Sequence, residues 1–145
     1  MAPAAREPVW SQHLTEPLAR VIPAARRPAA VVAIKSFHTV AFVLIAAMIV
    51  LVAWDGLRGR ATRRTVAATS VALAESAVFA SNNRVCPLTP LAEELGASSG
   101  SVTDIFLPDW LSRRIPVLFG GLLVIGLGLH VAGWRRRAAG VRPAR

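Results

Sequence analysis

The chain has 145 residues, of which 54% are hydrophobic, and it carries a net charge of +9. A positive mean hydropathy combined with so much positive charge is unusual for a soluble domain. The arginines stand in blocks at the ends of apolar runs, which is typical of charges that flank membrane helices and argues against nucleic-acid binding. The single cysteine excludes an intrachain disulfide bond.

Residues 1–34 form a tail rich in Ala, Pro and Arg. Five prolines stand too close together for one long helix, so this composition predicts a disordered or interfacial segment. Apolar residues nonetheless recur every fourth position from Trp10 to Ile22, which would place a stripe on one helical face. This stripe favours adsorption to a membrane surface as an alternative, although Pro17 interrupts it.

The first membrane span is predicted over residues 36–54, which carry no fixed charge. About nineteen residues at roughly 1.5 Å of rise each give a helix of about 28 Å, close to the roughly 30 Å of a hydrocarbon core. The second span, residues 63–82, is weaker because it is rich in small and polar residues and contains Glu75. Small residues recur at every fourth position of this second span, namely Ala68, Ala72, Ser76 and Ala80. This ridge predicts close packing with another helix, with a second copy or with a membrane-protein partner.

The third span is predicted over residues 115–134 and is followed by three arginines and a basic tail at 139–145. The loop at 83–114 contains Thr89 and Pro90, which are typical of a helix start, and Gly96, which is typical of a stop. We therefore expect this loop to contain a short helix and to fold against the bundle.

These elements predict an all-α fold, in which residues 35–138 form a membrane domain of three transmembrane helices. The densest arginine blocks follow the first and third spans, whereas the loop at 83–114 also carries acidic residues. The distribution favours a multi-pass protein of the inner (plasma) membrane with its N-terminus and long loop outside and its C-terminus inside. The lipid bilayer is then the expected environment.

The segment Cys86-Pro87-Leu88-Thr89-Pro90-Leu91, placed directly after an apolar helix, resembles the signature of a family of small uncharacterised bacterial multi-pass membrane proteins. Three further stretches fit the same group, namely Lys35 with Phe37-His38-Thr39, the turn Asp55–Arg60 and the segment Gly100–Pro108. The resemblance spans about residues 34–133 and implies no catalytic residue and no cofactor. The chain departs from the family pattern at Ala92, where the family has an acidic residue, and in the distance from Glu75 to Cys86.

In the favoured orientation, polar and ionisable residues from distant parts of the chain converge near the outer surface. This predicted layer consists of His38, Asn82, Asn83, Arg84, Cys86, Thr89, Asp104 and Asp109, with Glu75 deeper in the second span. Interfacial polar groups also gather wherever helices end, and Thr89 is then expected only to cap the next helix. Neither a metal site nor a cofactor site is assigned to this layer.

Three functions remain open. The first is a non-enzymatic protein that works by helix packing or by binding a partner. The second is a small proton-coupled transporter or carrier that uses Glu75, because a carboxyl group inside a membrane is a functional hypothesis by default. The third is a membrane thiol enzyme that uses Cys86 and His38. A protonated or hydrogen-bonded Glu75 that simply sets the helix register is the structural alternative to the second.

Overall fold

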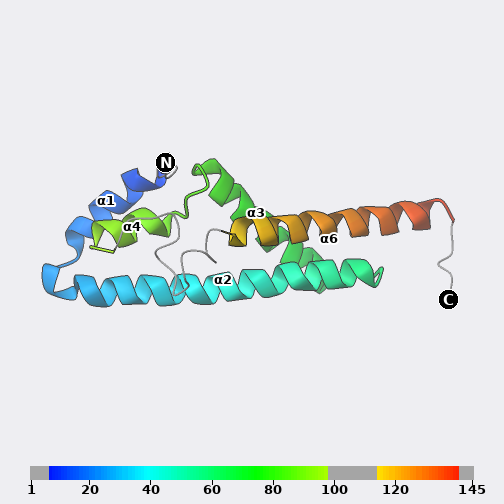
Figure 1. Cartoon of the computed structure of the whole chain (residues 1–145), viewed down its shortest axis with the longest axis horizontal. Helices are drawn as coiled ribbons and strands as arrows, with labels where there is room; N and C mark the ends of the chain where they lie inside the picture. Colours follow the sequence, from blue (N-terminus) through cyan, green and yellow to red (C-terminus); the bar gives the residue numbers. More distant parts are fainter. Residues whose placement is uncertain (1–6, 98–113, 141–145) are drawn as a thin grey trace. The chain divides into compact units, whose positions relative to one another are not determined.

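The computed structural model describes residues 7–97 and 114–140, and all regular secondary structure in these two ranges is helical (Figure 1). The elements are α1 (Ser11–Val21), the 3-10 turn η1 (Ala24–Arg26), α2 (Arg27–Leu57), α3 (Arg63–Ser81), α4 (Leu88–Glu94) and α6 (Ile115–Ala138). The prediction of an all-α chain is confirmed. Asp104 and Asp109 lie outside the described residues.

The chain divides into two compact units. Within the described residues, the first unit comprises 7–43 and 74–97, and the second comprises 44–73 and 114–140. Helices α2 and α3 contribute residues to both units. Each unit has its own polar and apolar contacts.

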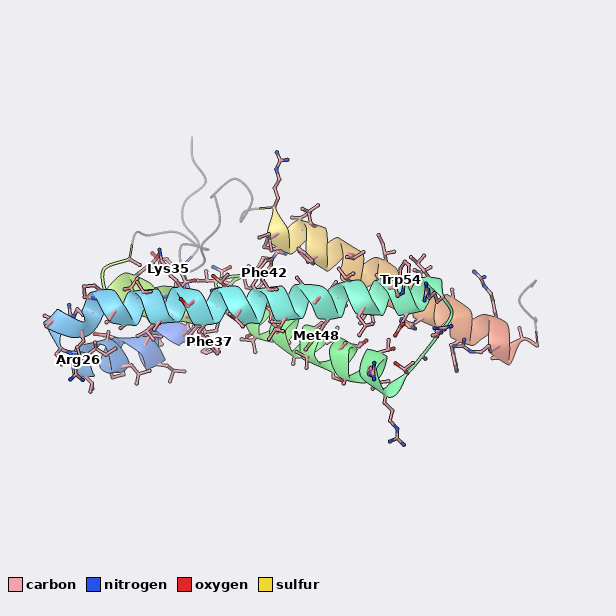
Figure 2. All side chains as sticks on the ribbon, turned by 90° about the horizontal axis from the view of Figure 1, so that it is seen from below. Arg26, Lys35, Phe37, Phe42, Met48 and Trp54 are labelled. Carbon is pink, nitrogen blue, oxygen red and sulfur yellow. The ribbon has the colours of Figure 1, made fainter. Side chains whose placement is uncertain are left out.

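Two described helices are long and apolar enough to cross a membrane, at Ala24–Leu57 and Ile115–Ala138. Only 28% and 11% of their most apolar windows are buried inside the protein. The core helix of a soluble protein would bury most of this surface, whereas Phe37 and Trp54 are exposed on α2 (Figure 2). This outward-facing apolar surface supports a membrane location.

Helix α2 begins at Arg27, well before the predicted span at residue 36. Pro28 stands in the first turn, where a missing backbone N–H costs nothing, and the Ala- and Val-rich residues 29–34 continue the helix. At 31 residues, α2 is about 46 Å long, which exceeds a hydrocarbon core of about 30 Å. The surplus lies in the part that precedes the uncharged run.

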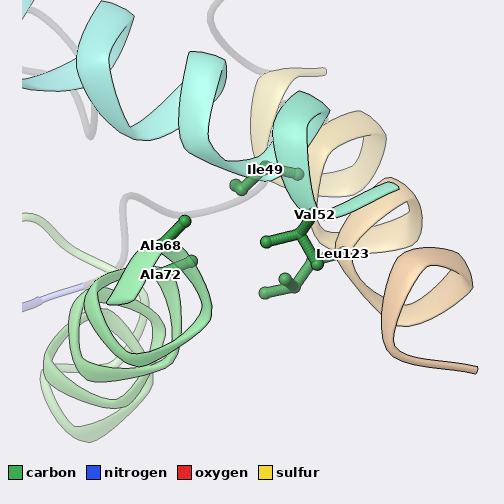
Figure 3. Close-up of a cluster of buried hydrophobic side chains, with 5 residues drawn as sticks. All are labelled: Ile49, Val52, Ala68, Ala72 and Leu123. Atoms are coloured by element: carbon green, nitrogen blue, oxygen red, sulfur yellow. The ribbon is translucent and has the colours of Figure 1, made fainter. Parts of the chain in front are cut away.

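The core of the second unit is a small cluster to which three helices contribute (Figure 3). Its members are Ile49 and Val52 from α2, Ala68 and Ala72 from α3, and Leu123 from α6. Ala68 and Ala72 belong to the predicted ridge of small residues, and both are buried within this single chain. The first half of the ridge therefore packs internally, while Ser76 is half-buried and Ala80 is exposed.

Helices α2 and α6 approach each other through glycine. A Cβ atom added at Gly126 would lie 3.1 Å from the Cα and N atoms of Ala53, and one added at Gly56 would lie 3.0 Å from the Gly126 carbonyl oxygen. The His130 ring nitrogen Nε2 is 3.0 Å from the Val52 carbonyl oxygen. Because a carbonyl only accepts, Nε2 carries the hydrogen of this bond.

The pairings show how α2 and α6 run in the second unit. Gly126 meets Ala53, whereas the later residues Leu129 and His130 meet the later residue Gly56. At the C-terminal end of α6, the Arg137 guanidinium donates to the Gly59 carbonyl over 3.0 Å. Contacts that advance together along both helices mean that α2 and α6 are parallel.

We predict that Gly126→Ala lowers the free energy of unfolding by about 1 to 3 kcal/mol, because the new methyl group meets backbone atoms that cannot move independently. Gly121→Ala is the matched control, since no atom lies within 4 Å of the added Cβ there. Reversible unfolding in bicelles measures both variants. Equal stability of the two would contradict the close approach of α2 and α6.

Candidate functional site

Asn82, the first residue after α3, organises the polar contacts of the first unit. Its side-chain Oδ1 accepts hydrogen bonds from the backbone N–H groups of Val9, Trp10 and Ser11, at 3.0, 3.2 and 3.3 Å. Its Nδ2 donates to Ser11 Oγ at 2.8 Å and to the Val85 carbonyl at 2.9 Å. The side chain is fully buried, and both of its polar atoms are satisfied.

Asn82 thereby serves as a cap from a distant part of the sequence. The first N–H groups of a helix have no partner within the helix, and Trp10, at the N-cap position of α1, supplies no side-chain cap of its own. The Trp10 indole donates instead to Ser81 Oγ at 3.3 Å, and Asn83 Nδ2 donates to the Glu7 carbonyl at 3.0 Å. The start of α1 is thus bound to the end of α3.

The turn after α3 is unusual in its backbone. Asn83 and Arg84 both have positive φ angles, of 57° and 62°. Asparagine tolerates this left-handed region, whereas an arginine there costs about 1 kcal/mol or more. The Arg84 N–H donates to the Phe79 carbonyl at 2.9 Å, which satisfies one of the last carbonyl groups of α3.

Helices α1 and α4 pack together in this unit (Figure 1). Helix α1 buries the small residues Ser11, Thr15 and Ala19, which recur every fourth position. Residues 11–21 lie in the segment for which a disordered or interfacial tail was predicted, and they form a helix despite Pro17. Pro17 removes one backbone hydrogen bond inside this helix. The packing of α1 on α4 and the bonds from its first N–H groups to Asn82 provide tertiary support.

Helix α4 begins at Leu88, two residues before the predicted first residue Pro90, and Pro87 is its N-cap residue. The predicted capping by Thr89 is therefore wrong, because Thr89 stands inside the first turn and is buried. Its Oγ1 has no hydrogen-bond partner among the described residues. Cys86 is half-buried and is a free thiol, and its carbonyl accepts from the Thr89 N–H at 3.0 Å.

Two members of the predicted set, His38 on α2 and Glu75 on α3, interact with each other. The interaction is electrostatic, and the two residues are widely separated in sequence. The other described members, from Asn82 to Thr89, share the turn after α3 and the start of α4. No group of three metal-ligating side chains occurs within residues 7–97 and 114–140.

A second polar cluster, in the second unit, was not predicted from the sequence. The Thr65 hydroxyl donates to the buried carboxylate of Asp55, and it accepts from the Thr62 hydroxyl at 2.8 Å. Thr62 and Thr65 also cap each other's backbone N–H groups, at 3.2 Å each. The pattern Thr-x-x-Thr before an apolar segment is the signal that indicates this helix start.

Comparison of the chain with family models, with curated proteins and with solved structures gives no match. The family suggested by the segment beginning Cys86-Pro87 stays a prediction.

We predict that Asn82→Ala releases the N-terminal segment from the end of α3. Three backbone N–H groups would lose their acceptor, at a cost of about 1 to 3 kcal/mol. Hydrogen exchange of the Val9, Trp10 and Ser11 amides should accelerate by about tenfold or more. Asn83→Gly is the control, because it removes a single exposed bond, accepts the positive φ of this position, and should leave the Ser11 amide protected. Unchanged protection in the Asn82 variant would refute the cap.

Proposed function

We propose that this chain is a three-span bacterial inner-membrane protein of the family suggested by its Cys-Pro-Leu-Thr-Pro-Leu segment, and that it works without catalysis by binding a protein partner. The parallel course of α2 and α6 supports three spans. If both candidate spans cross the membrane in the same direction, the chain between them must return once. A chain with only these two crossings would have antiparallel spans.

Helix α3 is the candidate for the return crossing. Its 19 residues give a length of about 28 Å, which suits a hydrocarbon core. It is less apolar than α2 and α6, and Glu75 adds an insertion cost of roughly 2.5 to 3.5 kcal/mol if charged at mid-membrane. Burial of Ala68 and Ala72 against α2 and α6 residues is consistent with a marginal helix that neighbours hold in place.

The orientation follows from charge in this proposal. The turn after α2 and the end of α6 carry two blocks of arginines, and the bond from Arg137 to Gly59 joins them at one end of the second unit. Positive charge of this density favours the cytoplasmic face. The proposal therefore has the C-terminus inside and residues 82–97 outside.

We predict opposite exposure for cysteines placed before and after α3. In a Cys86→Ser background, the exposed positions Ala61, Glu94 and Ala139 are changed singly to cysteine. A membrane-impermeant maleimide added to intact spheroplasts should label Glu94→Cys only, and permeabilisation should expose the other two. Labelling of Glu94→Cys on the same side as Ala61→Cys would contradict the third crossing, and full reversal would contradict only the orientation.

The observation that supports partner binding is the outer face of α1. Leu14, Leu18 and Val21 are 60%, 57% and 80% exposed, although α1 lies outside both candidate spans. They lie beside the buried face of small residues, so the packing on α4 leaves them uncovered. Exposed apolar side chains grouped on one helical face are typical of an interaction surface.

The charge on α1 favours a protein as the occupant of this face. Helices that lie on anionic membranes usually carry several lysines or arginines on the polar face. The polar face of α1 contains Arg20, which forms an ion pair with Glu16, together with His13 and Gln12. This helix therefore has little net charge with which to attract lipid headgroups.

We predict that a photo-reactive benzoylphenylalanine at Leu14 crosslinks in cells to a protein of defined mass. The same residue at Gln12, on the polar face two positions away, should give no such adduct. Western blotting of the membrane fraction measures both. Adducts with lipid alone, or equal protein adducts at both positions, would contradict a partner-binding face on α1.

A further inference from the structure

The turn between α2 and α3 borders a hollow of about 390 Å³ in the second unit. Its lining residues are Leu51, Asp55, Arg60, Thr62, Arg63 and Arg64. Three of the six carry guanidinium groups, and one is a carboxylate. The hollow thus combines an apolar side chain from α2 with a rim of positive charge.

The neighbouring arginines are already engaged, whereas those of the hollow are not. The Arg58 guanidinium lies 4.2 Å from the centre of the Trp54 ring, and Arg137 bonds to the Gly59 carbonyl. Arg60, Arg63 and Arg64 have no ion pair in the part of the chain that the structure describes.

The carboxylate in the lining does not remove this positive character. Asp55 is buried and accepts the hydroxyl hydrogen of Thr65, and the Asp55 carbonyl accepts the Arg60 N–H at 2.9 Å. These bonds hold the turn in shape. With three guanidinium groups against one carboxylate, the lining keeps an excess of positive charge.

We propose that this hollow binds the headgroup of an anionic phospholipid, with the phosphate at Arg60, Arg63 and Arg64. Guanidinium groups form paired hydrogen bonds with phosphate oxygens, which makes arginine well suited to such a ligand. Basic pockets at the cytoplasmic ends of membrane helices are typical sites for anionic headgroups. This inference rests on the membrane topology proposed above.

The position of the hollow favours a lipid over a free anion. Its lining residue Asp55 directly follows the uncharged run of α2, which ends at the exposed Trp54, and this is the expected depth of lipid headgroups. Leu51, one helical turn before Asp55, supplies an apolar wall on the membrane side of the arginines. A free phosphate would use the arginines only, whereas a phospholipid uses both parts of the lining.

The test is a lipid titration of the full-length protein, purified in detergent and followed by native mass spectrometry. We expect phosphatidylglycerol to bind at least about tenfold more tightly than phosphatidylcholine with the same acyl chains, since each arginine near a headgroup contributes appreciably. In the Arg60→Gln/Arg63→Gln variant, affinity for phosphatidylglycerol should fall by about tenfold. Equal affinity for the two lipids in the wild-type protein would overturn the proposal.

The control variant removes two positive charges, as the test variant does, but at positions outside the hollow. Arg135→Gln/Arg136→Gln changes two arginines that do not line the hollow, and its affinity should stay within about threefold of wild type. An equal loss in both double variants would mean diffuse attraction and would overturn a defined site. Inorganic phosphate should neither bind measurably nor displace phosphatidylglycerol, and displacement would mean a free-anion site instead.

A third variant tests whether positive charge at positions 60 and 63 supports lipid binding. Arg60→Lys/Arg63→Lys keeps the positive charge and should bind phosphatidylglycerol more tightly than the glutamine pair. Lysine keeps the charge but lacks the paired donors of guanidinium, so a partial recovery of affinity is expected. Equal loss in the two pairs would mean that positive charge in the hollow does not attract the headgroup, and the proposal would fail. If the protein with wild-type arginines shows the expected cysteine-labelling pattern but does not prefer phosphatidylglycerol, this inference is overturned. The proposed topology would then still stand.

Discussion

The contact between α2 and α6 at Gly56 and Gly126 sets the direction in which the two most apolar helices run. With backbone atoms about 3 Å from the position of any added Cβ, side chains cannot intervene, so the helices meet along a glycine and alanine seam. This seam aligns the ends of the two helices, and Arg137 then reaches the carbonyl of Gly59. A parallel pair of spans requires a crossing between them, which is why α3 becomes part of the proposed membrane domain despite its modest hydropathy.

The first unit is held by a different kind of contact, in which one amide side chain satisfies backbone groups from a distant segment. Asn82 accepts from three successive N–H groups and donates to two oxygens. A buried amide or N–H group without a partner is costly. Removing either the Asn82 side chain or the segment that it binds would therefore leave unpaired polar groups and lower stability. The same bonds orient α1, so that its small residues pack inward and its leucines remain on the outside, where the proposed partner would bind.

The arginines that flank the spans do not all play one role. Arg58 stacks on Trp54 and Arg137 closes the turn, and both therefore contribute to local structure. Arg60, Arg63 and Arg64 surround the hollow instead, which gives the proposed lipid site its charge. A topology prediction that counts positive residues treats all these arginines alike. Their contacts divide them into arginines that stabilise the local structure and arginines that are candidates for binding a ligand.

The sequence by itself determined the all-α class and the two most apolar helices, because composition and the absence of charge over a membrane-length run are local properties. It also indicated the short helix after Cys86, although α4 starts two residues before the predicted first residue Pro90, with Pro87 at the N-cap position. Only the tertiary structure decided that residues 9–11 bind Asn82, that Glu75 and His38 interact, and that Gly126 and not Gly121 meets α2. These pairings join residues up to about seventy positions apart, and no periodicity within one segment specifies which distant backbone group a side chain will meet.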